Sequence, residues 1–135
     1  MPQPTCVLDA SAIIAWFRGE PGDALVHAAI SKVAALSTVN WAESLFKLAD
    51  LGIDQNKAAL EMERSGVLGS LLQIRSFDEA QAREVARLRA RTRSAGLSLG
   101  DRACIALGLA LAVPVLTADR SWKALGLGVQ IRLIR

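Results

Sequence analysis

The sequence has 135 residues, of which 52% are hydrophobic and 21% are charged. This length suits a single domain over residues 1–135, with enough apolar residues for a core without disulfides or a structural metal. A net charge of +3 excludes a disordered or strongly acidic chain. The longest apolar stretch, residues 103–116, is broken by Gly108 and Pro114 and is shorter than the roughly 18 residues of a membrane span. The amino terminus does not resemble a signal peptide, so we expect a soluble, cytoplasmic protein without a membrane partner.

Short β-rich apolar runs alternate with longer runs of helical periodicity. This order predicts an α/β fold with a central parallel sheet of about five strands flanked by helices. The predicted strands are residues 5–8, 33–36, 71–77, 113–116 and 129–134. The predicted helices are residues 11–17, 23–30, 41–51, 55–65, 78–95, 99–112 and 121–125. The strands ending at Leu8 and Leu116 carry almost no polar residues and should be central, whereas the last strand alternates and should be an edge.

Acidic residues follow the two most apolar strands and begin two of the helices. Asp9 comes directly after the first strand, and Asp119 follows the strand that ends at Leu116. Glu43 and Asp101 lie in the first turns of their predicted helices. Since ligands of open α/β sheets bind at the carboxyl ends of the strands, we expect these carboxylates to come together there.

Each of these acids alone also has a purely structural interpretation. Asp9 and Asp119 could cap helices, and Asn40-x-x-Glu43 and Ser98-x-x-Asp101 resemble capping boxes. Capping does not explain why the acids should gather at one edge, where they would repel one another. An all-oxygen site of this kind suits Mg²⁺ or Mn²⁺ completed by water and substrate phosphate.

Four segments together resemble the PIN-domain ribonucleases, most closely the VapC-type toxins of bacterial toxin–antitoxin pairs. These segments are residues 7–12, 40–43, 97–107 and 116–122. The resemblance spans the chain and implies a Mg²⁺- or Mn²⁺-dependent endoribonuclease with an acidic pocket. The implied catalytic and metal-binding residues are Asp9, Glu43, Asp101 and Asp119. Ser11 and Thr117 match hydroxyl positions that support this pocket, although capping and strand propensity explain them equally well.

The resemblance also implies an RNA substrate, an antitoxin protein encoded alongside and a homodimer. Residues 83–102 carry six arginines but only two acids, Glu84 and Asp101. Arg83, Arg87 and Arg91 recur at helical spacing, which predicts a stripe along an RNA backbone or, alternatively, a solvated helix face.

The remaining chemically distinctive residues favour structural roles. His27 has no partner in sequence reach, and we interpret it as a surface or half-buried residue. Cys6 and Cys104 lie in apolar runs without metal-binding spacing and should be buried thiols. The tryptophans lie beside apolar helical positions and should mainly pack. The alternative to a nuclease is a non-catalytic RNA-binding or regulatory module with the same α/β fold. A haloacid-dehalogenase-like phosphatase is disfavoured because Ser11 stands where it needs a second Asp.

Overall fold

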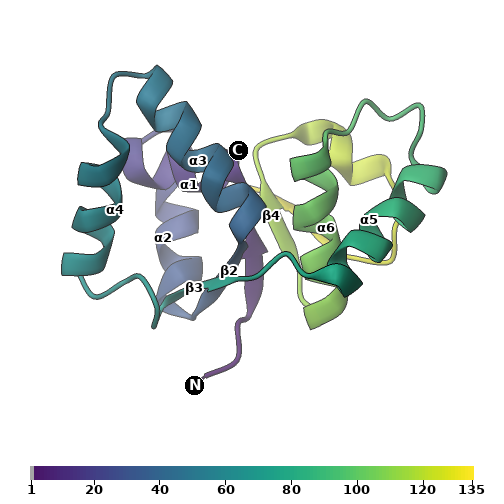
Figure 1. The fold of residues 1–135 in the computed structure, drawn as a ribbon, viewed down its shortest axis with the longest axis horizontal. Helices are drawn as coiled ribbons and strands as arrows, with labels where there is room; N and C mark the ends of the chain where they lie inside the picture. Colours follow the sequence, from purple (N-terminus) through teal and green to yellow (C-terminus); the bar gives the residue numbers. More distant parts are fainter. Residues whose placement is uncertain (1) are drawn as a thin grey trace.

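The computed structural model describes residues 2–135, and its strands and helices alternate along the chain as the sequence predicts (Figure 1). The strands are β1 (Cys6–Leu8), β2 (Ala34–Ser37), β3 (Leu72–Arg75), β4 (Val115–Thr117) and β5 (Ile131–Leu133). The helices are α1 (Ala10–Arg18), α2 (Asp23–Ser31), α3 (Thr38–Asp50), α4 (Gln55–Arg64), α5 (Glu79–Arg91) and α6 (Leu99–Leu111), with a 3-10 helix η1 (Arg120–Ala124). None of the helices within residues 2–135 is long and apolar enough to cross a lipid bilayer.

The strands form one parallel sheet in the order β3-β2-β1-β4-β5. β1 is the central strand and β4 lies next to it, whereas β5 is an edge, as predicted. The chain leaves β1 toward β2 on one side and returns to β4 on the other. The carboxyl ends of β1 and β4 therefore form the switch point where ligands of such sheets bind.

Alternate residues of the strands face two separate hydrophobic clusters, because side chains along a strand point to opposite faces. Val7, Ala35 and Val115 pack with α5, α6 and the region of η1. Leu8 and Leu116 face the other way and pack with α1, α2 and α4. Figure 1 shows α5 and α6 on one side of the sheet and α1, α2 and α4 on the other. Burial on both faces explains why β1 and β4 read as continuous apolar runs.

Two helix boundaries differ from the prediction in ways that matter for the site. α3 begins at Thr38 rather than Trp41, because the Ser37 side chain accepts a hydrogen bond from the Val39 amide at 3.2 Å and caps the helix. Asn40 is therefore inside the helix, and its interpretation as the start of a capping box is wrong. α5 ends at Arg91 rather than Ala95. The last predicted helix is a short 3-10 helix.

Arg102, the last of the six arginines in residues 83–102, is buried behind the turn that follows α5 rather than on the basic surface. Arg102 is 7% exposed, and its guanidinium donates to the carbonyls of Thr92 (3.2 Å) and Leu97 (2.8 Å) and to the Thr92 hydroxyl (3.0 Å). These bonds hold residues 92–97 as a turn between α5 and α6. Arg102 is thus a structural residue in this fold.

Candidate active site

The four predicted acids line one cavity at the carboxyl ends of the strands. The cavity has a volume of about 130 Å³ and includes Asp9, Glu43, Asp101 and Asp119 in its lining. Asp9 follows β1, Asp119 follows β4, and Asp101 lies in the first turn of α6. Glu43 lies in the second turn of α3 rather than the predicted first turn, because α3 begins at Thr38. Residues separated by most of the chain are thus brought together, as strand-end topology predicts.

Asp9 is the most deeply placed of these acids, being only 6% exposed. Its Oδ1 accepts hydrogen bonds from the Ser11 hydroxyl at 2.6 Å and from the Ala12 amide at 2.9 Å, and its Oδ2 accepts one from the Thr117 hydroxyl at 2.5 Å. Burial raises the pKa of Asp9 above its ordinary value of 3.8, the three hydrogen bonds oppose this shift, and the nearby Asp101 charge adds to it. Burial and the Asp101 charge therefore disfavour the charged form of Asp9, while the hydrogen bonds hold its carboxyl group in place.

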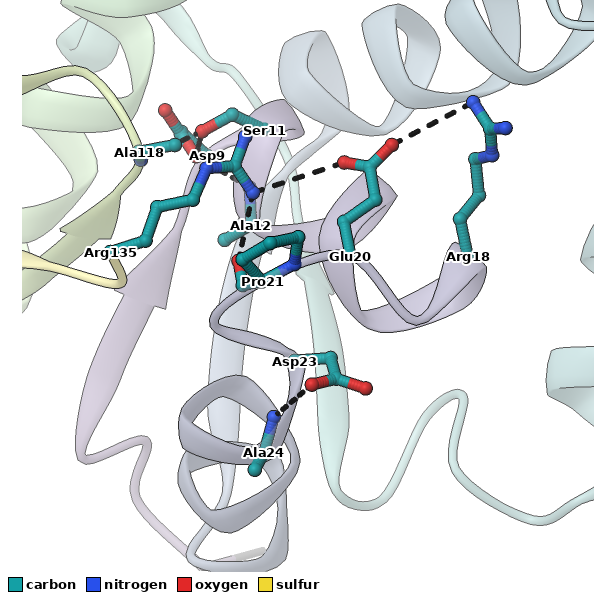
Figure 2. A network of polar contacts seen from close by, with 10 residues as sticks. All are labelled: Asp9, Ser11, Ala12, Arg18, Glu20, Pro21, Asp23, Ala24, Ala118 and Arg135. Carbon is teal, nitrogen blue, oxygen red and sulfur yellow. Dashed lines mark hydrogen bonds and ion pairs between the residues drawn. The ribbon is translucent and has the colours of Figure 1, made fainter.

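Ser11 and Thr117 join the ends of β1 and β4 through Asp9. The Ser11 hydroxyl accepts from the Ala118 amide at 3.0 Å while it donates to Asp9. The Thr117 hydroxyl likewise accepts from the Asp119 amide at 3.0 Å and donates to Asp9. Figure 2 shows Asp9, Ser11 and Ala118 grouped at this joint. Neither hydroxyl caps a helix, because the N-cap of α1 is Asp9 itself.

The same close view shows how the α1–α2 turn is fixed near the end of β5. Glu20 lies between Arg18 (3.6 Å) and Arg135 (3.9 Å), and Arg135 also donates to the Pro21 carbonyl at 2.8 Å (Figure 2). These charges belong to the scaffold, since Glu20 and both arginines are absent from the cavity lining.

Each remaining acid accepts hydrogen bonds through one oxygen and leaves the other oxygen available, and for Asp101 and Asp119 these bonds cap a helix. Asp101 Oδ2 accepts from the Ser98 amide at 2.9 Å in the predicted capping box. Asp119 Oδ1 accepts from the Ser121 amide (3.0 Å) and hydroxyl (2.6 Å). Glu43 Oε1 accepts from the side-chain Nδ2 of Asn40 at 2.8 Å. Among residues 2–135, no group donates a hydrogen bond to the second oxygen of these three carboxylates. Capping by Asp101 and Asp119 is therefore compatible with ligand binding.

The donor set suits a hard divalent cation. No three metal-ligating side chains in the described part of the chain converge as a ready-made ion cluster. An ion here would thus take few protein ligands directly and fill its coordination shell with water, which is how Mg²⁺ is commonly bound. The atoms available to bind a metal ion are all carboxylate oxygens. The only His, His27, is exposed on α2 away from the cavity. The residues present fit Mg²⁺ or Mn²⁺ better than a softer metal.

Lys47 and Trp122 also line the cavity, and Lys47 is a residue that the sequence did not single out. Lys47 lies four residues after Glu43 on α3 and supplies a positive charge beside the acids. Its spacing from Glu43 was the available signal, because side chains at i and i+4 share a helix face. Trp122 also lines the cavity but is 1% exposed, in keeping with the predicted packing role.

Both cysteines are buried, as predicted. Burial raises the pKa of Cys6 to about 11, with Arg132 and Thr5 opposing the shift. Burial raises the pKa of Cys104 as well, and the charges of Asp9, Asp101 and Glu43 add to that shift. Both groups therefore remain thiols at neutral pH, and Cys104 lies close enough to three of the acids to sense their charge.

The predicted arginine stripe is shorter in the structure. Arg83 pairs with Glu79 at 2.7 Å and Arg87 with Glu84 at 2.8 Å, so two members of the stripe are neutralised within α5. Arg89, Arg91 and Arg93 are exposed and have no acidic partner within residues 2–135. The unpaired positive charge therefore lies at the carboxyl end of α5 and in the turn that leads to α6.

The family model of the PIN domain matches residues 6–127. The chain belongs to the PIN-domain family. A comparison with curated protein sequences finds no match. The PIN fold is shared with a toxin–antitoxin complex from Klebsiella pneumoniae, with a TM-score of 0.72, 18% identity and coverage of 96% of this chain and 98% of that chain. It is also shared with VapBC2 from Rickettsia felis bound to a promoter DNA fragment (TM-score 0.70, 16% identity, coverage 95% and 97%).

A third similar structure is VapC20 from Mycobacterium tuberculosis, described as a toxin that cleaves the sarcin–ricin loop. Its TM-score is 0.70 at 13% identity, with coverage of 93% of this chain and 98% of that chain. At these identities the structural likeness establishes the α/β fold of this PIN domain, and the resemblance to VapC-type proteins is confirmed at the level of the fold.

Proposed function

We propose that this PIN domain is a Mg²⁺- or Mn²⁺-dependent endoribonuclease and the toxin of a toxin–antitoxin pair. The observation that carries the proposal is the single cavity lined by Asp9, Glu43, Asp101 and Asp119. Four acids from four segments meet there, and three of them keep one oxygen free of protein donors within residues 2–135. Membership of the PIN-domain family supports the same function.

Asp9 and Asp101 would hold the ion, and Glu43 and Asp119 would assist directly or through water. A bound ion of this type supplies an activated water and neutralises charge on the phosphate. The chain's own residues do the rest: Ser11 and Thr117 fix the Asp9 carboxylate, and Lys47 adds positive charge to a cavity that an RNA phosphate must enter. In-line attack by water at phosphorus then gives 5′-phosphate and 3′-hydroxyl ends.

The proposed partners are an RNA substrate, a cognate antitoxin and a second copy of the chain. RNA is favoured by the unpaired arginines Arg89, Arg91 and Arg93 at the turn that leads to Asp101. An antitoxin is favoured because several solved proteins with this fold are toxin–antitoxin complexes, some of them bound to DNA. The homodimer rests on the family resemblance.

The test is cleavage of a panel of structured RNAs in Mg²⁺, in Mn²⁺ and in EDTA. We expect cleavage only with a metal, 5′-phosphate products, and a loss of orders of magnitude in Asp9→Asn. The matched control is Asp50→Asn, which removes a carboxylate from the exposed end of α3 outside the cavity. Cyclic 2′,3′-phosphate products would contradict the metal-dependent mechanism. RNA binding without cleavage under every condition would support the non-catalytic alternative.

A further inference from the structure

A buried asparagine links the Glu43 carboxylate to the start of α6. Asn40 is 1% exposed and lies three residues before Glu43 on α3. Its Nδ2 donates to Glu43 Oε1 at 2.8 Å and to the main-chain carbonyl of Gly100 at 2.9 Å. Gly100 directly precedes Asp101 in the chain. One amide group therefore ties together the segments that carry two of the proposed metal ligands.

The orientation of this amide is fixed by its surroundings. Both N–H groups of Asn40 point at oxygens, so a flipped amide would place its oxygen against the Glu43 carboxylate and the Gly100 carbonyl. The Asn40 Oδ1 atom, in contrast, is buried and receives no hydrogen bond from the described residues. A buried acceptor without a donor lowers stability. The fold therefore tolerates a penalty on the oxygen while both N–H groups are used at the site.

Gly100 leaves the space that Glu43 occupies. A Cβ atom at position 100 would overlap the carboxyl group of Glu43. Glycine within a helix is less favourable than alanine, so helix formation alone does not explain its presence near the start of α6. Close approach of the Glu43 side chain to the α6 backbone does explain it.

We propose that Asn40 and Gly100 are positioning residues that hold Glu43 beside Asp101, so that the free oxygens of both carboxylates serve one metal ion. Asn40 acts from α3 by donating to Glu43, and Gly100 acts from α6 by admitting it. This inference rests on the proposed metal-dependent function. It gives a role to the Asn40-x-x-Glu43 spacing, which capping does not explain because Ser37 caps α3.

The first test is a Mn²⁺ titration of the apo protein, followed by the electron paramagnetic resonance signal of free Mn²⁺. We expect Asn40→Ala to weaken Mn²⁺ binding about 10-fold, the usual scale for residues that orient a metal ligand. In a Glu43→Ala background the same substitution should change the affinity no further. The matched control is Ser44→Ala: Ser44 is buried on the same helix, and its hydroxyl donates to the Asn40 main-chain carbonyl at 2.7 Å.

The second test approaches the contact from α6 and also reads thermal stability in EDTA. Gly100→Ala should weaken Mn²⁺ binding and lower the melting temperature, because the new methyl group displaces Glu43. In the Glu43→Ala background the same substitution should raise the melting temperature, since alanine is the better helix former once the carboxylate is gone. A Gly100→Ala protein that melts higher than the parent and binds Mn²⁺ equally well would overturn the inference.

The two proposals fail in different ways. A wild-type protein that binds no Mn²⁺ at Asp9 and Asp101 would overturn the proposed function and this inference with it. Wild-type binding that Asn40→Ala leaves unchanged would overturn the inference alone. If Asn40→Ala does not fold, as judged by its melting curve in EDTA, the Gly100→Ala pair decides the question.

Discussion

Asp101 closes a capping box and is also a proposed metal ligand, and two substitutions separate these roles. Asp101→Asn removes the charge but keeps an oxygen that can accept from the Ser98 amide, as Oδ2 does at 2.9 Å. Ser98→Ala removes the hydroxyl that accepts from the Asp101 amide at 3.1 Å and leaves the carboxylate intact. Asp101→Asn should therefore change metal binding, whereas Ser98→Ala should change only the stability of the helix end.

The expected sizes follow from the cap and the length of the chain. Loss of an N-cap hydroxyl lowers stability by about 1 kcal/mol. An unfolding entropy of roughly 2.1 cal/mol/K per residue gives roughly 0.28 kcal/mol/K for 135 residues, so this loss lowers Tm by roughly 3.5 °C. Mg²⁺ at a hundredfold excess over Kd stabilises by roughly 2.7 kcal/mol, which corresponds to roughly 10 °C.

The assay is thermal unfolding of the parent and both variants in EDTA and in Mg²⁺. Ser98→Ala should lose the same few degrees in both buffers. Asp101→Asn should melt at or above the parent in EDTA, because one of several repelling carboxylates has lost its charge, and should lose most of the gain that Mg²⁺ gives the parent. Parallel shifts of Asp101→Asn in the two buffers would refute its role as a metal ligand.

Three further changes test the charges around the cavity. Burial raises the native pKa of Asp9, so the stability that Asp9 contributes is fully present below its unfolded pKa and is lost as pH rises through its native pKa. Asn does not titrate, so the unfolding free energy of Asp9→Asn relative to the parent should rise with pH. Urea melts without metal measure this difference. Lys47→Met should tighten Mg²⁺ binding in calorimetry but weaken RNA binding in Ca²⁺, and the same sign for both would exclude this electrostatic role. Arg89→Gln with Arg91→Gln should flatten the salt dependence of RNA affinity, whereas Arg83→Gln, which removes an arginine already paired with an acid, should change it little.

Much of the fold could be predicted from local patterns. β1 and β4 are buried on both faces and therefore appear as apolar runs, while the alternation in residues 129–134 marks the edge position of β5. The boundaries that failed depend on competition or distant contacts. Ser37 caps α3 before Asn40 can, and Arg102 bonds to Thr92 and Leu97 in the turn that follows α5. Helical periodicity contains no information on either contact.

The convergence of the four acids was predictable because parallel topology brings strand ends to one edge. The supporting contacts were not. The bond from the Thr117 hydroxyl to Asp9 and the bond from the Ala118 amide to the Ser11 hydroxyl depend on the pairing of β1 with β4. The bond from Asn40 to the Gly100 carbonyl depends on the packing of α3 against α6. These contacts join residues 60 to 108 positions apart, a range that sequence spacing alone does not resolve.

Several groups at the cavity lower the stability of the fold, and their position there favours a functional role for the four acids over helix capping alone. Within residues 2–135 the buried side-chain polar atoms without a partner are Asn40 Oδ1 and Trp122 Nε1, and both residues belong to the cavity or contact its lining. Asp9, the most buried of the acids, has a raised pKa at the same place. Capping stabilises a helix and would not require any of these penalties. Features that destabilise the fold and gather at one switch point are what a site built to bind charge would show.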